Sequence, residues 1–274
     1  MSCSPFDETH HTEPGDVILT QAQGVATLTL ARPRYLNAMT WAMYSRLAEH
    51  IAAVSRDSSV KVIVLRGEGS KALAAGTDIH QFADFDGRQG IAYEKKVDSI
   101  VSVLAMVAKP TIAVIQGYAV GGGMALAAAC DLRYANASAR IGIPIARTLG
   151  NCLAFSTYRR LTEIMGASQV KELVYTGRLM SAGEGKATGF ITNIFDDESF
   201  EPQLSEVVDA IASHAPLTLW ATKTAFLRWE ELTRQTIDQR IPFEEVVERV
   251  YDSQDFRQAV RSRMTKEPPT WSGQ

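Results

Sequence analysis

Two glycine-containing turns could do chemistry, because glycine lets a backbone approach a ligand closely. One occupies residues 74–78, Ala-Ala-Gly-Thr-Asp, and the other occupies residues 117–123, Gly-Tyr-Ala-Val-Gly-Gly-Gly. Each comes after an apolar stretch typical of a buried strand and precedes a helix start, where backbone N–H groups lack partners. Two such turns lying side by side would each point one N–H at a single oxygen. The pattern therefore predicts an oxyanion hole.

Two other interpretations of these turns fit less well. A glycine turn after a strand is often purely structural, although that explains one turn better than a pair. A dinucleotide site needs the spacing G-x-G-x-x-G and an acidic residue about 20 positions further on. The second turn has the spacing G-x-x-x-G-G-G instead, and no acidic residue lies close to that distance after it.

Alternating strand and helix patterns position the turns. A hairpin is predicted from residues 17–20 and 25–30, with a turn at Gln23-Gly24. Thr40 is the predicted N-cap of the helix that follows. The other predicted elements are strands at 60–65, 111–115, 131–135, 140–143 and 191–195 and helices at 91–107, 154–165 and 167–175. Strands separated by helices indicate an α/β fold with largely parallel strands.

The pattern changes near residue 200. From there on the sequence predicts helices and no further strand, with helices at 200–214, 216–228, 241–251 and 256–264. This second unit is either a cap on the core or an oligomer interface. The chain thus divides into a loose N-terminal tail at 1–15, an α/β core at 16–200 and a helical region at 201–274.

Composition limits the classes of function. The 274 residues, of which 46% are hydrophobic, are enough for one substantial core. A net charge of -3 provides no broad field for a polyanion, so nucleic acid is not an expected partner. Three scattered cysteines, Cys3, Cys130 and Cys152, indicate neither a disulfide framework nor a metal site. The start has no signal-peptide features and no apolar stretch is long enough for a membrane span, so we expect a soluble cytoplasmic protein.

The turns belong to a longer set of motifs that resembles the crotonase superfamily, the enoyl-CoA hydratase/isomerase family. The motifs lie at residues 31–33, 36–38, 74–79, 117–123 and 130–135, and the likeness continues to residues 271–273. The resemblance implies a crotonase-like spiral of ββα units with a C-terminal helical oligomerisation region. It also implies an acyl-CoA thioester as substrate, no cofactor beyond the coenzyme A of that substrate, and a homotrimer or a dimer of trimers.

The resemblance assigns roles to residues of both turns. The residue after Ala-Gly and the middle glycine of the triple provide the two N–H donors in the family, and here these are Thr77 and Gly122. The residues implied to line the pantetheine and adenine path are Arg34, Leu36, Ala75, Asp78 and Ile79. Asp78 is equally well interpreted as a helix cap.

The chain departs from the family's hydratases at their two catalytic glutamates. In those enzymes one carboxylate takes a proton while the other delivers one. The corresponding positions here hold Ala125 and Ile145, and neither side chain can move a proton. Water addition by the usual route is therefore not expected. Simple double-bond isomerases keep the second glutamate, so they fit less well too.

Asn151 and Cys152 stand where the 4-chlorobenzoyl-CoA dehalogenase branch has an Asn-Asp pair with a nucleophilic aspartate. A cysteine in the first turn of a helix has its thiolate favoured, which makes Cys152 a candidate nucleophile or acid/base. The alternative is an inert packing residue. Asn151 is a catalytic candidate or the N-cap of that helix. Arg147 could hold a carboxylate, and His80 and Tyr118 are polar groups close to the turns.

Three functional hypotheses remain open. The first is an acyl-CoA lyase, isomerase or hydrolase of lipid metabolism that stabilises a thioester enolate or oxyanion through Thr77 and Gly122. The second is a CoA-thioester-binding protein that has lost its chemistry. The third is a residual hydratase or isomerase that uses another carboxylate, Glu94 or Asp98.

Overall fold

A larger and a smaller β-sheet form the centre of the computed structural model, which describes residues 14–82, 85–265 and 267–274. The predicted tail, with Cys3, lies outside these ranges except for its last two residues. The larger sheet contains, in spatial order, β1 (Asp16–Ala22), β2 (Val25–Ala31), β3 (Val62–Gly67), β5 (Thr111–Ile115), β7 (Leu132–Asn136) and β10 (Asn193–Phe195). The smaller sheet contains β4 (Ala72–Ala75), β6 (Tyr118–Val120), β8 (Arg140–Gly142) and β9 (Met180–Ser181).

The larger sheet confirms the predicted α/β fold. β1 and β2 form the predicted antiparallel hairpin, in which Val17 lies opposite Leu30. From β2 to β10 each strand runs parallel to its neighbour. Every residue of β5 is buried, as expected for a parallel strand covered on both faces.

The smaller sheet was not predicted, and it changes where the glycine turns belong. β4 and β6 are four and three residues long, and neither contains a run of β-branched residues. The first turn begins within β4 and the second contains β6, so neither leads directly from the longer buried strands β3 and β5 to a helix. The repeating unit is a strand of each sheet followed by a helix: β3, β4 and α2 (Gly87–Ala105), then β5, β6 and α3 (Gly122–Ala129). This is the ββα spiral that the motifs imply.

Helices bury their apolar faces on the two sheets. α1 (Trp41–Arg56) begins after Thr40, as predicted, and the Thr40 hydroxyl accepts a hydrogen bond from the N–H of Met43. The other elements of the core are α4 (Ile145–Thr148), α5 (Phe155–Met165), α6 (Ala167–Thr176), α7 (Ala182–Ala187) and the 3-10 helices η1 (Pro33–Tyr35), η2 (Ile79–Phe82) and η3 (Asp197–Ser199). Across the described ranges, no helix combines the length and the apolar character that crossing a membrane requires.

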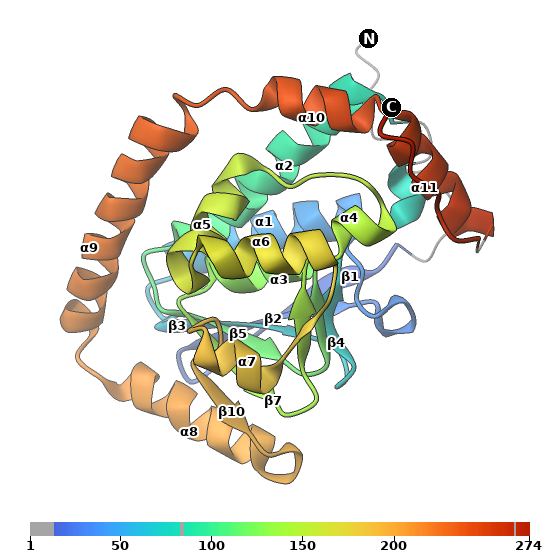
Figure 1. The fold of residues 1–274 in the computed structure, drawn as a ribbon. Coiled ribbons are helices and arrows are strands. Elements are labelled where there is room, and N and C mark those ends of the chain that lie inside the picture. Colours follow the sequence, from blue (N-terminus) through green and yellow to red (C-terminus); the bar gives the residue numbers. More distant parts are fainter. Residues whose placement is uncertain (1–13, 83–84, 266) are drawn as a thin grey trace.

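The C-terminal helices form an arm around the core, in agreement with the helical character predicted beyond residue 200. α8 (Phe200–Ser213), α9 (Pro216–Thr233), α10 (Glu244–Tyr251) and α11 (Gln254–Thr265) run around its outside (Figure 1). α9 stands away from the sheets, whereas α10 returns to α2. Gly90 permits that contact, because a side-chain carbon there would lie 2.2 Å from the ring of Tyr251.

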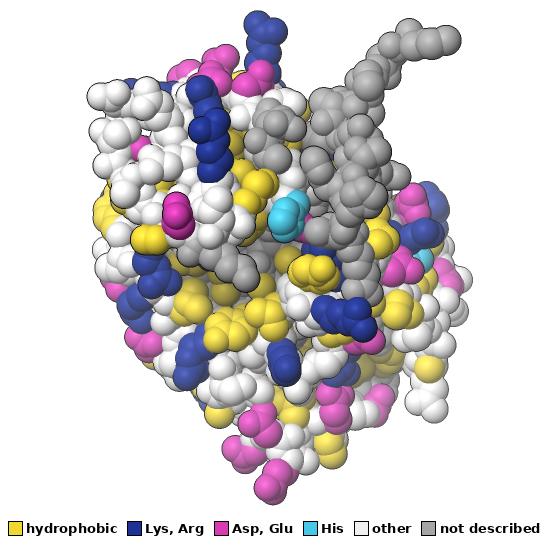
Figure 2. Space-filling view, turned by 90° about the vertical axis from the view of Figure 1, so that its right-hand side faces the viewer, with side chains coloured by type: hydrophobic (Ala, Val, Ile, Leu, Met, Phe, Trp, Pro, Cys, Tyr) yellow, Lys and Arg dark blue, Asp and Glu magenta, His cyan; other side chains and the backbone are white. Residues whose placement is uncertain are grey.

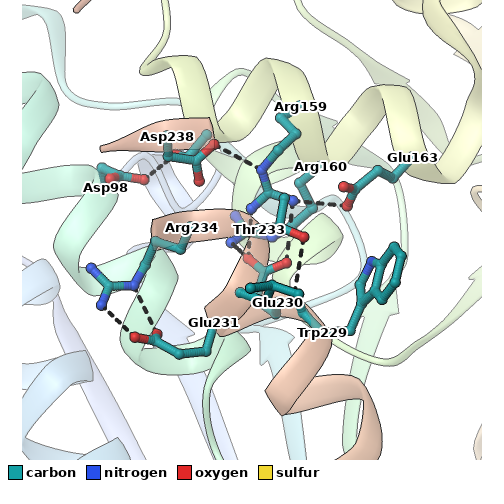
Figure 3. Close-up of polar contacts among 12 residues, drawn as sticks. Asp98, Arg159, Arg160, Glu163, Trp229, Glu230, Glu231, Thr233, Arg234 and Asp238 are labelled. Atoms are coloured by element: carbon teal, nitrogen blue, oxygen red, sulfur yellow. Dashed lines mark hydrogen bonds and ion pairs between the residues drawn. The ribbon is translucent and has the colours of Figure 1, made fainter. Parts of the chain in front are cut away.

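A cluster of ion pairs fastens the end of α9 to α5 (Figure 3). Arg159 lies 2.8 Å from Glu230 and 2.9 Å from Asp238, and Arg160 lies 2.7 Å from Glu230. Asp238 ends η4 (Arg234–Asp238), a π-helical turn that continues α9. These side chains are largely buried, so the loss of one partner would leave the others with an unpaired charge. The cluster therefore holds the arm in place where it turns back towards the core.

Gly123 lets α3 lie directly against β4, and this contact can be tested. A side-chain carbon on Gly123 would lie 2.1 Å from the carbonyl oxygen of Ala74. We expect Gly123→Ala to lower the free energy of unfolding in urea by about 1–3 kcal/mol, because the two backbones must move apart. Gly183→Ala in α7 is the matched control, since the nearest atom there is Oγ of Ser181 at 4.0 Å. Equal stability of the two variants would contradict this packing.

Candidate active site

The two glycine turns lie side by side, as predicted. β4 and β6 are parallel neighbours, and Ala75 pairs with Val120 at their ends. Thr77 and Gly122 each follow that pair by two residues. A side-chain carbon on Gly122 would lie 3.6 Å from Oγ1 of Thr77. The two residues expected to provide the N–H donors are therefore close in space.

The backbone N–H of Thr77 faces away from the segment that pairs with it. The N–H of Met39 donates to the carbonyl of Gly76 at 2.8 Å, and the carbonyl of Met39 accepts from the N–H of Asp78 at 2.9 Å. Met39 and Thr77 form a parallel bridge, and Met39 bonds to the two neighbours of Thr77 rather than to Thr77 itself. In such a bridge the N–H of Thr77 points away from Met39. Over the described part of the chain, this N–H donates no hydrogen bond. It is available to a ligand.

The N–H of Gly122 is unpaired because Gly122 is the first residue of α3. The preceding Gly121 has φ 55° and ψ -117°, a conformation that L side chains rarely adopt, and its own N–H donates to Gly142 at 2.9 Å. At the other end of α3, the guanidinium of Arg133 donates to the carbonyl of Cys130 at 2.6 Å. A cation there stabilises the helix at its negative end. The positive end, at Gly122, faces the Thr77 turn.

Buried hydroxyl groups meet beside the two donors. Oγ1 of Thr77 lies 3.0 Å from the hydroxyl of Tyr44 and 2.9 Å from that of Tyr93. A side-chain carbon on Gly122 would lie 2.8 Å from the Tyr44 hydroxyl. Burial raises the pKa of Tyr44 to about 12 and that of Tyr93 well above its usual value, so both phenols stay protonated. Neither tyrosine was predicted as a site residue from the sequence. Each lies on the buried face of its helix, α1 or α2, and a hydroxyl on such a face was the feature that could have indicated it.

Leu36 and Ala75, both expected along the coenzyme A path, lie together at the end of β4. The carbonyl of Leu36 accepts a hydrogen bond from the N–H of Ala75 at 3.0 Å. Leu36 has a left-handed backbone with φ 51°, a strained conformation for a bulky residue and one that often marks functional sites. Arg34 is exposed in η1, and Ile79 is half-buried at the start of η2.

The carboxylate of Asp78 is engaged within the protein. Its Oδ2 lies 2.7 Å from Nη2 of Arg32, and both side chains are buried. Its Oδ1 accepts a hydrogen bond from the N–H of His80 at 3.1 Å, at the start of η2. This geometry favours the helix-cap interpretation of the side chain.

The two residues expected at the positions of the hydratase glutamates, Ala125 and Ile145, lie in apolar surroundings. Ala125 lies in the first turn of α3, and Ile145 begins α4. Both side chains are buried in the hydrophobic cluster that also contains Tyr44 and Tyr93.

The premise for a reactive Cys152 is wrong. α5 begins at Phe155, so Cys152 precedes the helix and Asn151 does not cap it. Burial and the nearby Glu94 raise the pKa of the Cys152 thiol to about 12, which opposes formation of the thiolate. Asn151 instead donates to the hydroxyl of Tyr251 at 3.4 Å. The structure favours a packing role for Cys152.

Glu94 and Asp98 lie apart from the glycine turns. The Tyr251 hydroxyl donates to Glu94 at 2.6 Å, and burial raises the pKa of Glu94 to about 8 despite that hydrogen bond. Asp98 accepts a hydrogen bond from Ser156, and burial raises its pKa as well. Both carboxyls line a cavity of about 160 Å³ between α2, α5 and α10. Among the described residues, neither carboxyl has a hydrogen bond to a residue of the turns.

The remaining polar candidates lie at the surface. His80, Tyr118 and Arg147 are exposed. Asp131 has a structural role, because its carboxylate accepts hydrogen bonds from Thr111. Among the residues whose structure is described, no three His, Cys, Asp or Glu side chains form a group that could hold a metal ion.

Glu94 should make stability depend on pH. Its pKa is about 8 in the folded chain and 4.5 ordinarily, so between these values the folded chain keeps a proton that the unfolded chain has lost. Stability therefore falls as pH rises through this window. In Glu94→Gln the side chain still accepts a hydrogen bond from Tyr251 but does not titrate. We therefore expect the free energy of unfolding in urea to fall less in this variant than in the wild type between about pH 5 and about pH 8. A fall equal to that of the wild type would contradict this assignment.

The whole chain resembles known proteins. The enoyl-CoA hydratase/isomerase family profile matches residues 20–274. A short-chain-enoyl-CoA hydratase of Clostridium acetobutylicum is 28% identical over 255 residues, covering 93% of this chain and 96% of that one. Among solved structures, an enoyl-CoA hydratase/carnithine racemase of Magnetospirillum magneticum has a TM-score of 0.76 at 28% identity, covering 94% of this chain and 96% of that chain. A methylmalonyl-CoA decarboxylase with bound 2S-carboxypropyl-CoA has a TM-score of 0.84 at 25% identity, covering 94% and 98%. The chain therefore belongs to the enoyl-CoA hydratase/isomerase family.

Proposed function

We propose that this chain is an enzyme that binds an acyl-CoA thioester and stabilises its enolate or oxyanion through the backbone N–H groups of Thr77 and Gly122. The observation that carries the proposal is the pair of unpaired donors held side by side after β4 and β6. Donors fixed before the substrate arrives need no reorganisation when negative charge develops on the thioester oxygen. The positive end of α3 adds to this stabilisation.

The coenzyme A part is proposed to pass along Arg34, Leu36, Ala75, Asp78 and Ile79. The exposed guanidinium of Arg34 suits a phosphate group, and the half-buried Leu36 suits the pantetheine chain. Figure 2 shows a face of the molecule on which Lys and Arg side chains are spaced among hydrophobic ones. Such a mixture supports the binding of a ligand that is apolar along its length and carries phosphates at one end.

The reaction proposed is loss of carbon dioxide from a thioester that carries a carboxylate on its α-carbon. The bond between that carboxylate and the α-carbon breaks, its electron pair forms the enolate, and a proton from solvent then restores the α-carbon. No protein base is needed, which fits a site with Ala125 and Ile145 in place of the hydratase glutamates. The likeness to a methylmalonyl-CoA decarboxylase at 25% identity supports the same choice.

The proposal assigns the reaction no cofactor beyond the coenzyme A of the substrate and places the protein in the cytoplasm. Cys130 and Cys152 are both free thiols. Free buried thiols suit a reducing compartment, where they stay unpaired.

We further propose that α9 is covered by other copies of the chain, in a homotrimer or a dimer of trimers. Its large apolar side chains are exposed in the single chain: Leu217, Trp220, Phe226, Trp229 and Leu232. Aromatic side chains of this kind are enriched at the centres of protein interfaces. A row of them on a helix that stands away from its own core supports assembly through the arm.

Assembly through α9 can be tested by sedimentation. The double variant Phe226→Glu/Trp229→Glu introduces charge at two side chains that are 68% and 67% exposed in the single chain. We expect the wild type to sediment as a trimer or hexamer and the variant to shift towards monomer, because buried charge opposes association. Tyr175→Glu on α6, an equally exposed aromatic outside the arm, is the control. A wild-type monomer, or a variant of unchanged mass, would contradict the proposal.

A panel of thioesters tests the proposed reaction. Pure protein is incubated with malonyl-CoA, methylmalonyl-CoA and crotonyl-CoA while carbon dioxide, free thiol and enoyl absorbance are followed. We expect carbon dioxide release from one of the carboxylated thioesters and no fast hydration of crotonyl-CoA, because Ala125 and Ile145 cannot move protons.

Each other hypothesis has its own outcome in this panel. Fast hydration of crotonyl-CoA would overturn the interpretation of Ala125 and Ile145, and its loss in Glu94→Gln would assign the chemistry to Glu94. Release of free thiol would indicate thioester hydrolysis. Tight binding without turnover would favour a CoA-thioester-binding protein that has lost its chemistry.

A further inference from the structure

We propose that the hydroxyl of Tyr44 is a third hydrogen-bond donor to the thioester oxygen held by Thr77 and Gly122. The inference rests on the proposed function, because it concerns the same oxygen. It adds a side-chain donor to two backbone donors, and it gives the buried Tyr44 of α1 a role in the reaction.

The first observation is position. Tyr44 is fully buried in α1, yet its hydroxyl lies where a side-chain carbon on Gly122 would come within 2.8 Å. The same carbon would lie 3.6 Å from Oγ1 of Thr77. The Tyr44 hydroxyl therefore lies beside both residues that carry the backbone donors. A larger residue at position 122 would also collide with it.

The second observation is a count of protons. The chain of hydroxyls from Tyr44 through Thr77 to Tyr93 carries three protons but contains two hydrogen bonds. Whichever way those bonds run, one proton is left without an acceptor among the residues that the structure describes. A buried donor without an acceptor is costly, so a site that keeps one is built for a ligand that accepts it. When Tyr93 donates to Thr77 and Thr77 donates to Tyr44, the spare proton is that of Tyr44, and an oxygen bound between Thr77 and Gly122 is its proposed acceptor.

The third observation concerns the state of the phenol. Burial raises the pKa of Tyr44 to about 12, so the hydroxyl keeps its proton at neutral pH. A phenol in that state donates a hydrogen bond rather than giving up a proton. Packing of the ring against Trp41, with centroids 6.1 Å apart, does not need the hydroxyl, whose partner among the described residues is Thr77.

The test uses [1-13C]butyryl-CoA, a saturated thioester that can be neither hydrated nor decarboxylated. Isotope-edited infrared spectroscopy follows its carbonyl band when the intact protein binds it. We expect the wild type to lower the band frequency, and Tyr44→Phe to return it part of the way towards the value in water. Tyr93→Phe is the matched control and should keep the wild-type band, since Tyr44 and Thr77 still share one hydrogen bond and leave one proton spare. Thermal unfolding checks that both variants fold.

A second variant keeps the test independent of folding. 3-Fluorotyrosine at position 44 is a stronger donor of nearly the same shape. It should lower the frequency of the carbonyl band further than the wild type does. Tyr44→Phe should also slow turnover of any substrate found by about 10²-fold, the cost typical of one oxyanion donor. A wild-type shift left unchanged by both Tyr44 substitutions would overturn the role of Tyr44 alone. The absence of any shift in the wild type would overturn the proposed function, and this inference with it.

Discussion

The site depends on the close approach of two backbones where α3 begins against the end of β4. A carbon on Gly123 would lie 2.1 Å from the carbonyl oxygen of Ala74, so the two elements touch without intervening side chains. Each element is also fixed from outside. Asn37 donates to the carbonyl of Ala72 at 2.8 Å, and Arg133 holds the far end of α3. The distance between Thr77 and Gly122 follows from these contacts.

Donors and acids are kept apart around this contact. The groups next to Gly122 are neutral and rich in protons, whereas the buried carboxyls of Glu94 and Asp98 lie along a different cavity. Tyr93 and Glu94 are consecutive on α2, yet the first contacts Thr77 and the second contacts Tyr251. An environment of this kind stabilises negative charge on an oxygen better than it accepts a proton. This arrangement supports the proposed formation of an enolate by bond cleavage.

The two neighbouring turns could be predicted from the sequence because glycines and helix starts leave a local mark at Gly76 and at residues 121–123, whereas the choice of Thr77 and Gly122 as donors came from the resemblance to the family. The smaller sheet could not, because β4 and β6 are too short to show periodicity. The expectation for Cys152 failed because it needs Cys152 inside the first turn of the helix, whereas α5 begins at Phe155, within one residue of its predicted start. Tyr44 was missed because helical periodicity assigns a tyrosine to the core without saying where its hydroxyl points.

Backbone donors cannot be removed by ordinary side-chain substitution, so the most direct measurement is the position of a bound carbonyl. A crystal structure of the chain with butyryl-CoA should place the thioester oxygen about 2.7–3.1 Å from the backbone nitrogens of both Thr77 and Gly122. A thioester oxygen beyond hydrogen-bond reach of either nitrogen would contradict the oxyanion hole.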